Sequence, residues 1–377
     1  MLRLAAAIVL LAAPLHAEEV TLEHDGIVLL ADLVEAGDDE APVALITHGT
    51  LAHKDMELVE GLQDALAERG ITSLAHTLSF GVDRRTGMAD CSTPHTHRDT
   101  DADDEIAAWI DWLADRNVDA PVLIGHSRGG KQVARLAAGR DDLSAVILMA
   151  PATTSSTARG RKGYEARYGE ALWTVLERAK AVEADDILAV PGFLHCPDAK
   201  ARSASFQSYY GGPATGADTH VGDIVSPVLV VLAQKDAVLP KAPAAFAPLR
   251  SDSLDVKIVE DADHMFLDFY VEDAADLIET FVAGLGQGVE SGNATIDFST
   301  ADLEYGAYLA QECTSCHRVG GAQVPSLNGL DAEHIYEALG DYATGLRANP
   351  AMGLVARSLD EEQRIALSAY FALQKDY

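Results

Sequence analysis

Short apolar runs alternate with longer stretches of helical periodicity over most of the chain. The apolar runs, most of them continuous, predict strands at residues 42–47, 71–78, 122–124, 144–149, 227–233 and 255–259. Between them, apolar side chains recur every three or four positions and predict helices at residues 55–69, 101–113 and 131–138. An α/β chain of this kind forms a doubly wound, mostly parallel sheet, with ligands at the carboxyl ends of the strands.

Two segments depart from this alternation. Residues 19–34 alternate between apolar and polar and turn once at Asp25-Gly26, which predicts an antiparallel hairpin at the edge of the sheet. Residues 153–223 carry turn residues and helical pieces, such as residues 164–184, where a strand would be expected next. We interpret residues 153–223 as a lid inserted over the sheet.

The first residues have the pattern of a secretory signal peptide. Arg3 precedes an apolar stretch at residues 4–13, and the small Ala17 stands before Glu18. The alternative is a membrane anchor, but this stretch is too short to span a bilayer comfortably. We therefore expect export to the periplasm or beyond it, with no stable membrane span after cleavage.

Composition supports two domains and limits the possible partners. The chain has 377 residues and a net charge of −31. Its length allows a large core, and its charge repels nucleic acids and anionic membranes, so we expect neither as a partner. A signal peptide, a large α/β domain, a glycine-rich linker and a small helical domain are predicted at residues 1–17, 18–286, 287–300 and 301–377.

The strand predicted at residues 122–124 leads into the sequence G-H-S-R-G. Here Ser127 lies between Gly125 and Gly129, in the G-x-S-x-G pattern of a nucleophile elbow. Serine is a poor nucleophile at neutral pH and needs a neighbouring base. Asp236 and His264 each follow a later predicted strand, so all three side chains are expected at the same edge of the sheet.

The elbow and the order Ser127, Asp236, His264 resemble the α/β-hydrolase superfamily, including its esterase and dienelactone-hydrolase-like members, over residues 18–286. The resemblance implies Ser127 as nucleophile, His264 as general base and Asp236 as the acid that orients the imidazole. It also implies an oxyanion hole formed by the backbone amides of Arg128 and Thr50. The expected substrate is a small ester, lactone or thioester.

Several alternatives stay open for this domain. Asp236 could cap a helix, with Asp223, Asp261 or Asp263 as the catalytic acid, and Ser127 could be an ordinary turn serine. The whole domain could also be a non-catalytic docking scaffold in an electron-transfer protein, because a fold alone does not establish activity.

The segment after the strand at residues 71–78 holds further candidate chemistry. Residues 91–97, C-S-T-P-H-T-H, have metal-ligand character, but no second ligand cluster accompanies them. We therefore favour a loop at the rim of the active site. Arg84-Arg85, together with Arg128 beside the serine, either favours an acidic substrate or belongs to a solvated loop with ion-pair partners.

The four cysteines fall into two groups. Cys91 and Cys196 either form a disulfide in an oxidising compartment or are free thiols. Cys313 and Cys316 belong to C-T-S-C-H, the attachment motif of a covalent c-type haem, in which His317 would bind the iron. A zinc site would need a second cysteine pair and a thioredoxin-like site a βαβ unit, and neither pattern accompanies this motif. Because such a haem is attached outside the cytoplasm, the motif agrees with export.

Residues 301–377 resemble the small bacterial class I c-type cytochromes, an all-α fold with one covalent haem c. The C-x-x-C-H motif, the Pro325 loop, the Gly-Leu-Arg before Met352 and the closing L-S-A-Y-F carry the resemblance. It implies Met352 as the second axial ligand, whose thioether raises the reduction potential, with His334 or an open sixth position as alternatives. We expect one-electron transfer with a redox partner such as a periplasmic dehydrogenase or oxidase.

Overall fold

The computed structural model describes residues 17–37, 41–249, 253–285, 298, 301–317, 324–344, 347 and 349–374. The signal peptide predicted at residues 1–17 and the linker predicted at residues 287–300 lie outside these residues, apart from Ala17 and Phe298, and stay predictions. None of the described helices is long and apolar enough to cross a membrane.

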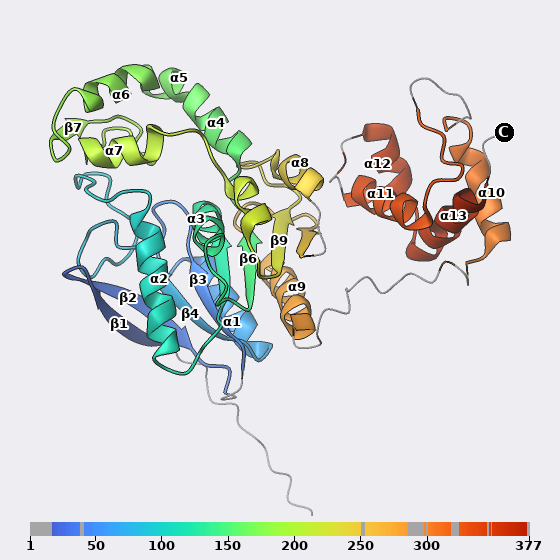
Figure 1. Ribbon diagram of the computed structural model, residues 1–377, viewed down its shortest axis with the longest axis horizontal. Coiled ribbons are helices and arrows are strands. Elements are labelled where there is room, and N and C mark those ends of the chain that lie inside the picture. The colour runs from blue at the N-terminus through green and yellow to red at the C-terminus, as the bar shows by residue number, and fades with distance from the viewer. Residues whose placement is uncertain are drawn as a thin grey trace, which may run out of the picture.

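An eight-stranded sheet forms the centre of the first domain, in the order β1-β2-β4-β3-β5-β6-β9-β10 (Figure 1). Its strands are Glu18–His24 (β1), Ile27–Val34 (β2), Val43–Thr47 (β3), Thr72–Thr77 (β4), Val122–His126 (β5), Ala145–Met149 (β6), Val228–Ala233 (β9) and Leu254–Val259 (β10). β2 pairs antiparallel with β1 and β4, and the other neighbours are parallel. The predicted mostly parallel sheet and its edge hairpin are confirmed.

Helices cover both faces of the sheet. They span Glu57–Glu68 (α1), Asp101–Ala114 (α2), Arg128–Ala137 (α3), Ala242–Phe246 (α8) and Tyr270–Leu285 (α9). Leu45 belongs to the core beneath α2 and α3, whereas the next residue, Ile46, belongs to the core beneath α1 and α9. Because successive strand residues enter different cores, the strands are continuously apolar.

Between β6 and β9 the chain leaves the sheet and forms the lid, residues 153–223. Its elements are Thr154–Lys162 (α4), Tyr164–Tyr168 (α5), Leu172–Lys180 (α6), Ile187–Ala189 (β7), Lys200–Arg202 (β8) and Ser203–Tyr210 (α7). In Figure 1 the lid helices form an arch along one side of the domain. The helical pieces predicted at residues 164–184 are two helices, α5 and α6, because Gly169, whose φ of 78° is left-handed, ends α5.

A disulfide between Cys91 and Cys196 ties the lid to the loop that follows β4. The two Cα atoms lie 5.3 Å apart. In the same loop, the backbone of His95 donates a hydrogen bond to Lys200 O at 2.8 Å and accepts one from Arg202 N at 2.9 Å. The loop after β4 is therefore joined to the lid by one covalent bond and by a short bridge to β8.

Replacing both Cys91 and Cys196 by serine is expected to lower the thermal stability of the first domain. The disulfide closes a segment of 105 residues, and restricting an unfolded loop of that length contributes about 4–5 kcal/mol in the chain-entropy model. Calorimetry with and without a thiol reductant tests this, because reduction should bring the parent protein down to the unfolding temperature of the double variant. If the reductant left the unfolding temperature of the parent protein unchanged, the expectation would be contradicted.

The described residues of the C-terminal segment form four helices with a small core of their own. They span Leu303–Cys313 (α10), Ala332–Thr344 (α11), Pro350–Arg357 (α12) and Glu361–Leu373 (α13). α10 and α13 cross closely at Gly306, where any side chain would clash with the backbone of Ala366. The buried residues of this core are Ala310, Ile335, Leu339, Ala356, Leu367 and Phe371.

Candidate functional site

Ser127 occupies the sharp turn between β5 and α3. Its φ of 55° and ψ of −115° lie in a region that non-glycine residues rarely adopt. Glycines make this turn possible, since a side chain at Gly125 would clash with Gly130 and one at Gly129 would clash with the backbone of His48. Such local strain, of order 1–3 kcal/mol, is held only by tight surroundings and is typical of functional sites.

Three side chains form a continuous hydrogen-bonded relay at this turn. His264 Nε2 lies 3.0 Å from Ser127 Oγ, and His264 Nδ1 lies 2.7 Å from Asp236 Oδ2. Asp236 follows β9 and His264 follows β10, so the carboxyl ends of parallel strands bring the three residues together. With Asp236 accepting at Nδ1, the neutral imidazole carries its proton there and offers Nε2 to the serine hydroxyl.

Asp236 both faces the imidazole and closes the turn after β9. Its second oxygen, Oδ1, accepts hydrogen bonds from Val238 N at 2.8 Å and Leu239 N at 2.7 Å. Burial alone would raise the pKa of Asp236, but the hydrogen bonds from His264 and these amides outweigh it and hold the pKa below its usual value. Asp236 therefore both caps the turn after β9 and pairs with His264, and its lowered pKa keeps the carboxylate charged.

The other candidate acids have other partners. Asp261 forms an ion pair with Lys235 at 2.6 Å, and Asp263 accepts a hydrogen bond from nearby backbone. Asp223 ends a short 3₁₀ helix in the lid. In the described structure, none of the three forms a hydrogen bond with His264.

The backbone around Thr50 and Arg128 lies beside the serine. Arg128 is the first residue of α3, so its amide has no partner within the helix. The Arg128 side chain joins the two segments, because its Nε donates to Thr50 Oγ1 at 3.0 Å. Gly49, which precedes Thr50, packs so closely that a Cβ on it would lie 3.3 Å from Ser127 Cβ. The two amides expected to form an oxyanion hole therefore belong to segments that meet at Ser127.

The end of α10 carries the two thiols of the C-x-x-C-H motif. Neither Cys313 nor Cys316 is in a disulfide; Cys313 is half-buried and Cys316 is exposed. The ring Nδ1 of the next residue, His317, donates a hydrogen bond to Pro325 O at 2.8 Å. This bond fixes the tautomer and leaves Nε2 as the nitrogen available to a metal.

Met352 lies in the first turn of α12, where the Asn349 side chain accepts hydrogen bonds from Ala351 N and Met352 N. Its side chain packs against the same apolar core as Cys313. His334, the alternative ligand, is an exposed residue of α11. These groups fit a c-type haem: two free thiols, an imidazole with Nε2 available and a half-buried thioether.

Comparison with known families assigns both parts of the chain. Residues 43–280 match the alpha/beta hydrolase family. The chain belongs to the alpha/beta hydrolase family. Residues 303–372 match cytochrome c, so this hydrolase carries a C-terminal cytochrome c domain, which implies a haem cofactor. No curated protein matches the chain.

Solved structures show the same fold for the larger domain of this hydrolase. Est1E from Butyrivibrio proteoclasticus is 20% identical, with a TM-score of 0.51, over 71% of this chain and 99% of its own. GrgF from Penicillium sp. sh18 is 17% identical, with a TM-score of 0.53, over 72% and 99%. Hypothetical protein PA2218 from Pseudomonas aeruginosa is 19% identical, with a TM-score of 0.53, over 75% and 99%. At these identities the likeness shows the fold alone.

Two buried histidines of the hydrolase support its site and were not singled out from the sequence. His126, in the elbow itself, donates from Nε2 to His264 O at 2.9 Å. His48 donates from Nδ1 to Gly49 O at 2.8 Å and accepts from Leu78 N at 3.0 Å. Burial lowers the pKa of His126 to about 4 and that of His48 well below its usual value, so both rings are neutral at neutral pH. The only signal in the sequence was their adjacency to Ser127 and Gly49.

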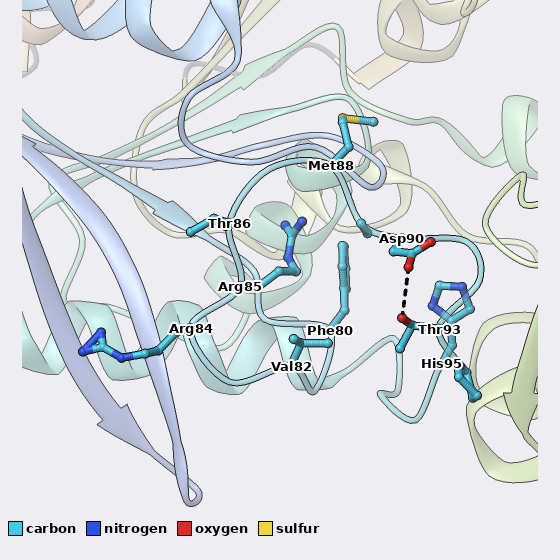
Figure 2. A pocket seen from close by; sticks show the side chains of 11 residues that line it. Phe80, Val82, Arg84, Arg85, Thr86, Met88, Asp90, Thr93 and His95 are labelled. Carbon is cyan, nitrogen blue, oxygen red and sulfur yellow. Dashed lines mark hydrogen bonds between the residues drawn. The ribbon is translucent and has the colours of Figure 1, made fainter.

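Arg84 and Arg85 belong to a pocket of about 290 Å³ in the loop after β4, and none of the three relay residues lines it (Figure 2). Arg85 is buried, and its guanidinium donates hydrogen bonds to the backbone carbonyls of Leu78 at 2.6 Å, Gly87 at 2.7 Å and Ala52 at 2.5 Å. Figure 2 shows Arg84 pointing away from Arg85, towards the β1–β2 hairpin. Arg85 anchors the loop and Arg84 is an exposed residue of it, so of the three arginines considered for an acidic substrate only Arg128 lies beside the serine.

The metal-like segment at residues 91–97 has a structural role. Cys91 is in the disulfide, and the rings of His95 and His97 pack among Phe80 and Phe193. Within the part of the chain that the structure describes, no group of three or more His, Cys, Asp or Glu side chains is arranged to hold a metal ion.

Proposed function

We propose that the hydrolase domain cleaves an ester-type bond, in an ester, lactone or thioester, by acyl transfer through Ser127. The observation that carries the proposal is the relay from Ser127 Oγ to His264 Nε2 at 3.0 Å and from His264 Nδ1 to Asp236 at 2.7 Å. A docking scaffold has no need for a strained serine, a correctly oriented imidazole and a charged carboxylate in one line.

In this mechanism Ser127 Oγ attacks the substrate carbonyl while His264 Nε2 takes its proton. The new imidazolium is stabilised by Asp236, and the amides of Thr50 and Arg128 donate to the oxyanion. The intermediate collapses as His264 returns the proton to the leaving alcohol or thiol. A water molecule then attacks the acyl-enzyme with the same help from His264, which releases the acid and restores the Ser127 hydroxyl.

We further propose that Cys313 and Cys316 would hold one haem c through thioether bonds, and that His317 Nε2 and Met352 Sδ would bind its iron. The hydrogen bond from His317 Nδ1 to Pro325 O supports this, because it orients the ring and makes Nε2 a better ligand. Bound haem supplies reversible one-electron chemistry at its iron. Met352 would raise the potential into the range of an electron carrier.

A periplasmic location and a redox partner, such as a dehydrogenase or oxidase, belong to the same proposal. They rest on the N-terminal pattern and on the C-x-x-C-H motif. One account of the fusion is that the hydrolase consumes a lactone or ester made by a dehydrogenase whose electrons the haem accepts. Reduction of the haem by that partner would support this account, and failure with every cognate dehydrogenase would count against it.

The hydrolase proposal is tested with the purified holoprotein and two measurements. It should hydrolyse short-chain 4-nitrophenyl esters, and a fluorophosphonate should stop turnover by labelling a single peptide that contains Ser127, as read by mass spectrometry. A protein that neither turns over such esters nor takes up the label would support the docking-scaffold alternative.

A further inference from the structure

Positive charge is concentrated in one segment that begins beside the proposed nucleophile, although the chain as a whole is strongly acidic. Residues 128–168 hold eight of the 28 Lys and Arg residues but only three of the 59 Asp and Glu residues. The segment begins beside Ser127, continues through α3 and β6, and ends in the first two helices of the lid. An excess of five positive charges in this segment contrasts with a net charge of −31 for the whole chain.

The cations of the first two lid helices, α4 and α5, are not neutralised by carboxylates of the described residues, unlike Arg178 and Lys180 further along the lid. Arg159 donates to Val238 O at 2.7 Å, and Arg161 donates to Gly212 O at 2.5 Å and Tyr209 O at 3.0 Å. Carbonyl oxygens satisfy hydrogen bonds without cancelling charge. Among the described residues, no ion pair is formed by the cations of α4 and α5, which are Arg159, Arg161, Lys162 and Arg167.

Beneath the lid, one buried carboxylate meets more cations than it can neutralise. Asp99 Oδ2 lies 2.6 Å from Arg135 Nη1 and 3.3 Å from Lys131 Nζ, and Arg135 also pairs with Asp103 at 2.7 Å. The two negative charges of Asp99 and Asp103 are thus matched by Lys131 and Arg135. Arg128 is a third cation at the edge of this group, with Nη1 4.0 Å from Asp99 Oδ1, and its charge is in excess.

The Arg128 guanidinium is held in place, but not all of its hydrogen-bond donors are used. Its Nε donates to Thr50 Oγ1 at 3.0 Å, and its carbon lies 5.6 Å from the centre of the Tyr209 ring in α7 of the lid. Neither Nη atom donates a hydrogen bond to any described residue, and Asp99 Oδ1 has no hydrogen-bond partner. The side chain is 24% exposed, so a ligand between the elbow and the lid can reach it.

Nearby histidines leave this excess unchanged at neutral pH. Burial, and then His95, lower the pKa of His97 to about 3. The pKa of His195 in the lid is lowered by burial and by the positive charges of Arg128 and Arg167. Both rings are therefore neutral, and they neither add to the excess nor offset it.

We propose that the substrate carries a carboxylate and that Arg128 binds it between the nucleophile elbow and the lid. The inference rests on the proposed esterase activity and narrows its substrate class. A guanidinium offers two parallel N–H donors to a carboxylate, and a partly dry setting strengthens such a pair. Because Nε is fixed on Thr50, the two Nη atoms are the donors available to the substrate.

The test compares charged esters with neutral esters of the same shape. On the acyl side, 4-nitrophenyl glutarate is paired with 4-nitrophenyl 5-methylhexanoate, in which an isopropyl group replaces the carboxylate. On the alcohol side, 4-(carboxymethyl)phenyl butyrate is paired with 4-isobutylphenyl butyrate. We expect the holoprotein to prefer the charged member of at least one pair by about 10- to 100-fold in kcat/KM, the effect of one hydrogen-bonded charge. Preference for the neutral ester in both pairs would overturn the inference.

Variants assign the preference to Arg128. Arg128→Gln should bring the charged-to-neutral ratio down by about 10- to 100-fold, and Arg128→Lys should restore part of it. The ratio is the readout because the amide of residue 128 also serves the oxyanion, so both esters can lose rate together. Arg140→Gln is the matched control, since Arg140 pairs with Asp142 beyond the end of α3 and should leave the ratio unchanged.

The two proposals fail in different ways. If the parent protein hydrolyses neutral esters but shows no preference for charged ones, or if Arg128→Gln keeps the ratio of the parent, the carboxylate inference fails and the esterase proposal stands. If the parent hydrolyses neither member of either pair and Ser127 takes up no fluorophosphonate, the esterase proposal itself fails.

Discussion

Replacing Ser127 by alanine is expected to lower kcat for 4-nitrophenyl esters by about 10⁴- to 10⁶-fold. In the proposed mechanism the Ser127 hydroxyl forms the acyl-enzyme, and the imidazole nitrogen that would take its proton lies 3.0 Å from it. Initial rates and a burst titration of the released nitrophenol measure the loss. The visible spectrum of the haem, whose proposed ligands all lie beyond residue 312, checks that the variant is intact.

Companion variants separate the relay from general damage. His264→Gln should be almost as inactive as Ser127→Ala, and combining the two should cost nothing further, because residues that act as one unit are not additive. Asp236→Asn should retain more activity than either, since the serine and its base are still present. Ser92→Ala, at an exposed serine of the loop after β4, should match the parent. Turnover by Ser127→Ala at the rate of the parent would exclude Ser127 as the nucleophile.

The strands and their order were predictable because both faces of the sheet are covered. Leu45 and Ile46 enter different cores, so the whole strand is apolar and stands out from its surroundings. The start of α3 was not predictable in the same way. Periodicity placed it at residue 131, but the helix begins at Arg128, since the packing of Gly129 against His48 overrides the weak helix propensity of two adjacent glycines.

The relay residues followed from sequence order, whereas the residues that support them did not. A parallel sheet brings the ends of β5, β9 and β10 to one edge, so Ser127, Asp236 and His264 could be placed together from the chain alone. The hydrogen bond from His126 to His264 O joins residues 138 positions apart. Arg85 likewise finds its carbonyl partners only in the folded loop. Contacts of this kind have no periodicity and leave no pattern in the sequence.

Replacing Cys313 and Cys316 together by serine is expected to abolish covalent haem attachment. Both thiols are free at the end of α10, and each is expected to form one thioether bond. The parent protein should keep its haem in a denaturing gel and show a mass increase of one haem by mass spectrometry. The double variant should show neither, and each single variant should retain haem through one bond with a shifted spectrum.

Two control experiments make this result specific to the C-x-x-C-H motif. The Cys91→Ser and Cys196→Ser double variant loses the disulfide of the first domain but should keep its haem, because those thiols are engaged with each other. Met352→Ala should keep the covalent haem and lower its reduction potential, whereas His334→Ala should leave the potential unchanged, since His334 is exposed. A protein that releases its haem on denaturation, or a potential that follows His334 rather than Met352, would contradict the proposed ligands. A single protein that carries covalent haem and whose Ser127 also takes up the fluorophosphonate would support both halves of the proposal, since both domains are then functional in one chain.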